Sequence, residues 1–300
     1  MALDKSVLSD YKKAGSILSE ALAHGNKLIK VDANILEVCQ AVEKKIHDLG
    51  GQMAFPAQPS IDNIAAHWCP DPGSKEVFTE GMLVKFDVGV HINGRIADSA
   101  FSVDLSDDKR YEGLIRASKN ARDEALKIMK PGTTLGEIGR VIQDEITREG
   151  FSPIRNLSGH GLGEYEVHTS PSIPNFDTGD KTELKEDMVV AVEPFATPGQ
   201  GKIFEQEQGN IYALIHVKPV RSPYAREALK IIESYNKLPF TLHWLSAQMG
   251  VGQAKLAMRE LIQKGAVEVY PPLPEVSGAV VSQSEHSVIV ADKPIVYTRE

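Results

Sequence analysis

The sequence predicts an α+β fold, in which amphipathic helices cover an antiparallel hairpin. Two observations lead to this prediction. An alternating apolar stretch surrounds the dipeptide Asn93-Gly94, which is typical of a β-hairpin. Apolar stripes at helical spacing both precede and follow that stretch. A chain of 300 residues is long for a single core, so we expect an additional subdomain.

Two helices are expected ahead of the hairpin. Residues 6 to 24 carry one apolar stripe and residues 34 to 49 carry another, which indicates that each helix buries one face. The stripes consist of Tyr11, Ala14, Leu18 and Ala21 in the first helix, and of Ile35, Cys39, Val42 and Ile46 in the second.

The hairpin itself is expected to hold two carboxylates side by side. If Ile92 pairs with Arg95 across a two-residue turn, Asp87 lies opposite Ala100 and Asp98 opposite Gly89. Both aspartates then point to one face of the sheet as diagonal neighbours, about 7–8 Å apart at the backbone, within reach of a shared metal ion. Taken alone, the pair is more typical of solvated carboxylates on the wet face of the hairpin than of a metal site.

A second pair of helices is expected after the hairpin. Leu114, Ala117, Ala121, Ala125 and Ile128 form one stripe, which ends before Pro131-Gly132. Thr134 and Glu137 have the spacing of a capping box and predict the start of the next helix, whose apolar face carries Leu135, Ile138 and Ile142.

Three further side chains have the chemistry of metal ligands. His160 lies in a glycine-rich stretch, Glu193 ends an apolar run, and Glu285 interrupts a strand-like run. Each could separately be a structural ion-pair partner, because a carboxylate in a core needs compensation. Together with the hairpin aspartates they make four carboxylates and one imidazole, a set suited to two adjacent divalent ions.

Composition limits the possible partners and compartments. The net charge is −8 and the pI is about 5.7, which disfavours a nucleic acid as partner. We expect a cytoplasmic protein without membrane contact, because the chain lacks a leader pattern and any apolar run of membrane-spanning length. The two cysteines, Cys39 and Cys69, provide no disulfide framework or thiolate cluster.

The five candidate ligands occur in the order and contexts of a known family. The chain resembles the methionine aminopeptidases, specifically the type 2 branch, over nearly its whole length. Supporting segments are Ala54-Phe55-Pro56, Asn63 to His67, His160 to His168, Val192 to Thr197, and Glu285-His286. The resemblance implies a pita-bread fold and a dinuclear metalloaminopeptidase that removes the N-terminal methionine.

The resemblance also assigns a role to each site residue. It implies that Asp87 binds one ion, that Asp98 and Glu285 bridge two, and that His160 and Glu193 complete the shell of the second ion. The two divalent ions would be Mn, Fe, Co or Zn, since an oxygen-rich set with one imidazole accepts any of them. Glu193 would also carry the proton from the attacking water to the leaving amine.

Substrate contacts follow from the same resemblance. His67 would lie toward the leaving nitrogen and His168 toward the carbonyl oxygen, whereas Phe55, Val167 and Tyr270 would line the methionine pocket. Each of these residues alone could be an ordinary structural residue. The expected partners are peptides and nascent chains that begin with methionine and have a small second residue, met at the ribosome.

Type 2 members carry a helical insertion, and Glu285 follows Glu193 here by 92 positions. We expect a winged-helix-like subdomain at 221–270, inserted into a catalytic domain formed by 1–220 and 271–300. Helical stripes occupy both halves of this span, with Leu238-Pro239 and Gly250 as breaks. Such a subdomain could bind DNA, but the acidic net charge of the chain disfavours it.

One loop departs from the family pattern. Gln58, Trp68 and Cys69 stand where relatives commonly have Asn, Tyr and Thr, so the loop that carries His67 is expected to differ in shape.

Two other functions compete with this interpretation. The chain could be a Xaa-Pro aminopeptidase or prolidase, which shares the fold and the ligands but usually carries a large preceding domain. It could also be a non-catalytic pita-bread protein that binds protein or nucleic acid, although all five ligands are intact.

Overall fold

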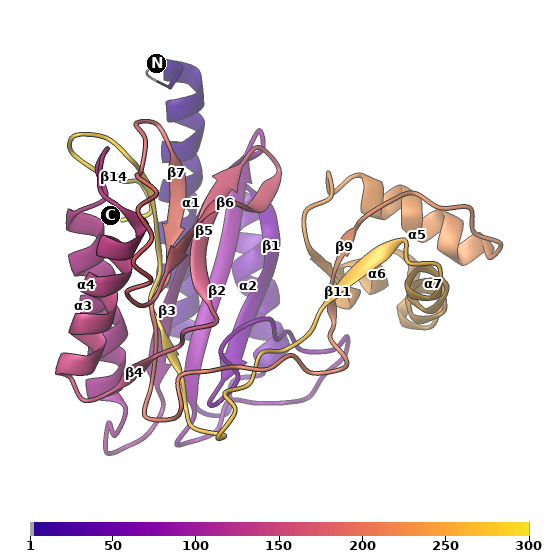
Figure 1. The fold of residues 1–300 in the computed structure, drawn as a ribbon. Coiled ribbons are helices and arrows are strands. Elements are labelled where there is room, and N and C mark those ends of the chain that lie inside the picture. Colours follow the sequence, from indigo (N-terminus) through magenta and orange to yellow (C-terminus); the bar gives the residue numbers. More distant parts are fainter. Residues whose placement is uncertain (1–2, 300) are drawn as a thin grey trace.

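Two helix pairs cover one side of a set of antiparallel strands, and a smaller helical unit stands apart from them (Figure 1). The structure, a computed structural model, describes residues 3–299. The helices are α1 (Lys5–Leu28), α2 (Ile35–Asp48), α3 (Glu112–Lys127), α4 (Leu135–Arg148), α5 (Pro223–Glu233), α6 (Leu242–Met249) and α7 (Val251–Gln263). The strands are β1 (Gln52–Ile61), β2 (Leu83–Ile92), β3 (Arg95–Asp104), β4 (Ser152–Pro153), β5 (Ser158–Gly163), β6 (Glu166–Pro174), β7 (Val189–Val192), β8 (Phe195–Thr197), β9 (Ile211–Leu214), β10 (Phe240–Thr241), β11 (Val267–Tyr270), β12 (Ser282–Gln283), β13 (His286–Ile289) and β14 (Ile295–Val296).

The first half contains the predicted hairpin. Strands β1, β2 and β3 form an antiparallel sheet against which α1 and α2 pack. The predicted register is confirmed: Ile92 pairs with Arg95, and Asp87 and Asp98 lie opposite Ala100 and Gly89. Asn93 and Gly94 have φ angles of 49° and 80°, the left-handed conformation that a type I′ turn requires.

The second half repeats the arrangement of a helix pair over strands. Helices α3 and α4 pack over the sheets β12-β8-β4 and β14-β13-β7-β5-β6. The capping box is confirmed, because the Thr134 hydroxyl accepts a hydrogen bond from Glu137 N while the Glu137 carboxylate accepts one from Thr134 N. Ile138 and Ile142 of α4 are fully buried, as the stripe predicts, and Ile146, one turn further along the helix, is fully buried as well.

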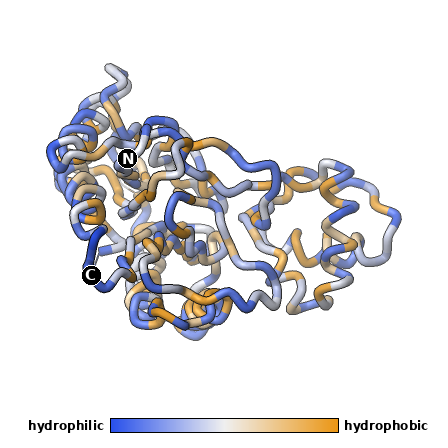
Figure 2. Tube along the Cα trace, turned by 90° about the horizontal axis from the view of Figure 1, so that it is seen from below, coloured by the Kyte–Doolittle hydropathy of each residue, from blue (hydrophilic) through white to orange (hydrophobic). Residues whose placement is uncertain are grey.

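The inserted unit has its own core. Helices α5, α6 and α7 pack on the sheet β10-β9-β11, and their apolar residues form a separate buried cluster. Its sheet includes β9, which precedes the expected start of the insertion at residue 221. Figure 2 shows this unit beside the main body, with apolar positions distributed along the traces of both. Such a unit can hold its shape while its docking to the body varies.

Docking of the insert depends on a buried carboxylate of α2. Glu43 is 7% exposed, and its Oε2 accepts hydrogen bonds from His243 Nε2 and Trp244 Nε1 of α6, each at 3.0 Å. Its Oε1 accepts a third bond, from Ala57 N of β1 at 3.3 Å. This side chain therefore connects the insert to the strand that carries Phe55.

Among the residues described, no helix has the length and apolarity needed to cross a membrane.

Candidate active site

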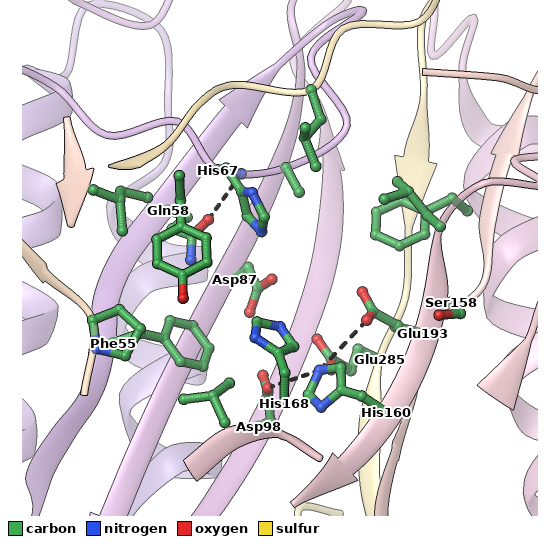
Figure 3. Close-up of a pocket in the computed structure, with 18 of the residues that line it drawn as sticks. Phe55, Gln58, His67, Asp87, Asp98, Ser158, His160, His168, Glu193 and Glu285 are labelled. Atoms are coloured by element: carbon green, nitrogen blue, oxygen red, sulfur yellow. Dashed lines mark hydrogen bonds and ion pairs between the residues drawn. The ribbon is translucent and has the colours of Figure 1, made fainter. Parts of the chain in front are cut away.

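A cavity of about 190 Å³ opens between the two halves, and the insert forms one of its walls (Figure 3). Every site residue named from the sequence lines it: Phe55, His67, Asp87, Asp98, His160, Val167, His168, Glu193, Tyr270 and Glu285. These residues come from β1, β2, β3, β5, β6, β11 and three connecting segments. The cavity therefore depends on the packing of both halves and the insert.

The hairpin aspartates point into the cavity from adjacent strands. The backbone of Asp98 is fixed by Ser287, whose hydroxyl accepts from Asp98 N at 2.9 Å and donates to Asp98 O at 2.8 Å. Asp98 is 2% exposed. Its position is thus set by strand pairing on one side and by β13 on the other.

The remaining three candidate ligands lie at breaks or bends of the second sheet. Glu193 sits between β7 and β8, Glu285 sits between β12 and β13, and His160 belongs to β5. His160 Nε2 is 3.8 Å from Asp98 Oδ2 and 3.5 Å from Glu193 Oε1. One ligand atom each of Asp98, His160 and Glu285 lies within 4.8 Å of the others. Side chains distant in sequence therefore meet closely enough to share ions.

The buried carboxylates of this cluster would be stabilised by bound cations. Burial raises the pKa of Asp87 to about 7, and burial together with the neighbouring carboxylates raises the pKa of Asp98, Glu193 and Glu285 well above the ordinary value. Asp87 Oδ1, Asp98 Oδ1 and both carboxylate oxygens of Glu285 lack a hydrogen-bond partner within the described residues. Buried acceptors without donors are costly, and divalent ions would satisfy them. The donor set of carboxylate oxygens and one imidazole therefore fits the expected metals.

Two further histidines frame the cavity. His67 lies in the β1–β2 loop with φ of 64°, and its backbone N–H donates to Gln58 Oε1 at 2.9 Å. The pKa of His67 falls to about 4, because of burial and of His168 nearby. The ring of His168, on β6, is 4.4 Å from that of His160. Gln58, one of the residues atypical of the family, thus holds the backbone that presents His67.

The candidate methionine pocket is apolar on one side. Phe55 and Val167 are 3% and 6% exposed, and the ring of Tyr270 packs edge-on against that of His67 at 5.7 Å. The absence of a side chain at Gly89 leaves room for the Phe55 ring, because a Cβ at position 89 would lie 2.3 Å from Phe55 Cε1. A side chain there would displace the ring.

Gln283 is a residue that the sequence reasoning missed. It is 1% exposed, and its Nε2 donates to Asp87 Oδ2 at 3.1 Å and to Glu193 Oε2 at 3.5 Å. It therefore links a ligand of the first half to one of the second. The signal was present in the sequence, since Gln283 precedes Glu285 by two positions in a strand-like run, where such residues share a face.

Comparisons with known proteins show the family of the chain. The model of metallopeptidase family M24 matches residues 9–218. A methionine aminopeptidase from Archaeoglobus fulgidus is 44% identical over 291 residues, which cover 97% of each chain.

Solved structures share the fold over the whole chain. A methionine aminopeptidase from Thermotoga maritima has a TM-score of 0.74 at 23% identity and covers 100% of this chain and 99% of its own. A thermophilic Arx1 has a TM-score of 0.85 at 16% identity and covers 99% and 91%. The predicted pita-bread fold is confirmed, and the chain belongs to metallopeptidase family M24 and, within it, to the methionine aminopeptidases.

Proposed function

We propose that this protein removes the N-terminal methionine from peptides with a small second residue, in a reaction that depends on two divalent metal ions. The observation that carries the proposal is that four carboxylates and one imidazole line one cavity, with buried carboxylate oxygens left without donors among the described residues. The named relative, a methionine aminopeptidase, supports the same activity.

The metal-holding residues are assigned from the cavity and the family resemblance. Asp87, Asp98 and Glu285, together with His160 and Glu193, would hold the two ions by direct coordination. Two divalent ions bound there would supply a nucleophile at neutral pH, since such ions lower the pKa of bound water to about 7. Gln283 orients Asp87 and Glu193 through its amide hydrogens.

The chain's own side chains would handle protons and developing charge. Glu193 would accept the proton of the attacking water and pass it to the leaving amine, because its carboxylate faces the cavity beside His160. His168 would donate to the carbonyl oxygen as negative charge develops on it, and His67 would contact the leaving nitrogen. A fixed donor of this kind typically contributes about 3 kcal/mol to the lowering of the barrier.

The pocket would select methionine by shape. Phe55, Val167 and Tyr270 offer apolar surface to an unbranched side chain, and one methylene more or less changes binding by about 1–3 kcal/mol. This gives a preference for methionine rather than absolute selectivity.

The insertion supports assignment to the type 2 branch. We assign residues 221–270 to a subdomain that forms one wall of the cavity and whose sheet also includes β9. Residues 1–220 and 271–300 form the catalytic domain. Nascent chains leaving the ribosome are the natural source of substrate. The proposed function therefore includes contact of this protein with the ribosome.

Release of N-terminal residues from peptides tests the proposal. The Mn-, Fe- or Co-loaded protein should release Met from Met-Ala-Ser much faster than Leu from Leu-Ala-Ser. Glu193→Ala should abolish turnover, and His168→Ala should lower kcat about a hundredfold, as loss of an oxyanion donor does. Turnover by Glu193→Ala equal to wild type would remove the mechanism.

The same assay separates the competing functions. Release of an N-terminal residue only ahead of proline would favour a Xaa-Pro aminopeptidase. A folded, metal-loaded protein that releases nothing would favour a non-catalytic binding protein.

A further inference from the structure

A second cavity, of about 510 Å³, lies on the other face of β3 from the active site. Asp98 lines the active site, whereas the next four residues of β3, Ser99 to Ser102, line this second space. We call it the rear cavity. Its walls come from α1, β3, α3 and the C-terminal segment, and comprise Ser19, Leu22, Ala23, Asn26, Ser99, Ala100, Phe101, Ser102, Ile115, Lys119, Arg122, Ser284, His286, Thr298 and Arg299.

The rear cavity is positively charged although the protein is acidic. Lys119, Arg122 and Arg299 line it, and its lining contains no aspartate or glutamate among the described residues. The nearby Asp123 lies outside the lining, where its Oδ1 accepts hydrogen bonds from both Arg122 and Arg299. Lys119 has no carboxylate partner within residues 3–299. Within residues 3–299, Asp123 is thus the one carboxylate that pairs with these cations, and it contacts Arg122 and Arg299 but not Lys119.

The excess of positive charge at the rear cavity is unfavourable chiefly because Arg122 is buried. Its side chain is 9% exposed, and burial lowers the pKa of its guanidinium despite the neighbouring Asp123. A buried cation that is incompletely compensated favours the binding of an anion, because the anion replaces the lost hydration. Guanidinium groups also present paired N–H donors that match the oxygens of a phosphate or sulfate.

The walls of the rear cavity are held in place by hydrogen bonds. Ser99 Oγ donates to Glu285 O at 2.7 Å and lies 3.2 Å from His286 Nδ1, which in turn is 3.0 Å from Thr298 Oγ1. Ser19 Oγ donates to Thr298 O at 2.8 Å. The cavity is thus preformed, so little ordering is needed on binding.

We propose that the rear cavity is a binding site for a dianionic phosphate or sulfate group, free or carried by a small molecule, with Lys119, Arg122 and Arg299 as its contacts. The site is separate from the candidate metal centre, although Ser99 and His286 are the chain neighbours of the ligands Asp98 and Glu285. The volume exceeds that of a bare phosphate, and Leu22, Phe101 and Ile115 provide apolar surface for an attached group.

Titration calorimetry of the metal-loaded protein tests the proposal, with sodium sulfate and adenosine monophosphate as probes and chloride holding the ionic strength constant. We expect saturable binding of at least one probe, and tighter binding of the nucleotide would indicate a carried phosphate. Lys119→Gln and Arg299→Gln should each weaken binding about tenfold or more, the usual effect of losing a charge-assisted hydrogen bond.

Matched variants make the result specific. Lys127→Gln removes a cation of α3 that pairs with Glu124 outside the cavity, so its affinity should equal that of wild type. Arg122→Lys keeps the buried charge and should bind better than Arg122→Gln. His160→Ala alters the metal centre and should leave probe binding unchanged. The proposal is wrong if neither probe saturates, if Lys119→Gln and Arg299→Gln bind as wild type, or if His160→Ala abolishes binding.

Discussion

Replacing Glu43 by alanine should loosen the insert and weaken substrate binding together. The carboxylate accepts hydrogen bonds from Trp244, His243 and Ala57 N, so it connects α6 of the insert to α2 and β1. The insert contributes Tyr270 and Pro239 to the cavity lining. Loss of this connection should therefore move a wall of the candidate methionine pocket without touching a candidate metal ligand.

The cost can be worked from these contacts. Hydrogen bonds to a charged group contribute about 1.5–3 kcal/mol each, and removing one partner of a buried charged cluster costs about 3–5 kcal/mol. The three donors lie in a region where Glu43 and His243 are 7% and 5% exposed, so water replaces the carboxylate poorly. We expect Glu43→Ala to lower the free energy of unfolding by about 3–5 kcal/mol. Glu43→Gln should lose less, because its amide oxygen still accepts one bond.

Urea unfolding followed by tryptophan emission measures this loss, since Trp244 is one of two tryptophans and donates directly to Glu43. Steady-state kinetics on a Met-Ala peptide should show a raised KM with a smaller change in kcat. Glu37→Ala, an exposed carboxylate of the same helix, is the control. A loss below about 1 kcal/mol for Glu43→Ala, with KM unchanged, would refute the reasoning.

Three further predictions follow from individual contacts. Gln283→Leu should weaken metal binding about 10–100-fold, because two ligand carboxylates lose their orienting donor; equal affinity in a metal titration would contradict it. Gly89→Ala should raise KM for methionine peptides while the protein stays folded, because the added Cβ forces the Phe55 ring to move; an unchanged KM would show that the pocket does not depend on this ring. His91 has a folded-state pKa of about 4 through burial, below the ordinary 6.5, so the unfolded chain takes up its proton first and stability is lost as the pH falls from about 6.5 to 4. His91→Gln should flatten this decline in denaturation experiments across that range, and an equal slope would exclude His91 as the cause.

Local signals in the sequence were sufficient for several elements. Asn93-Gly94 determined the turn and therefore the register that pairs Asp98 with Gly89, because a two-residue turn admits one alignment. Thr134 and Glu137 determined the start of α4 through a cap made within one helical turn. The family resemblance then named ten site residues, all of which line one cavity.

Other features were decided only by tertiary structure. Gln283 bridges Asp87 and Glu193, and Glu43 accepts bonds from residues about 200 positions further along the chain. The rear cavity likewise joins Lys119 to Arg299. Turns and caps depend on a few neighbouring residues and on backbone geometry, which a single sequence displays. Contacts between distant segments depend on how helices and sheets pack over the whole core, and neither periodicity nor spacing encodes which side chains that packing brings together.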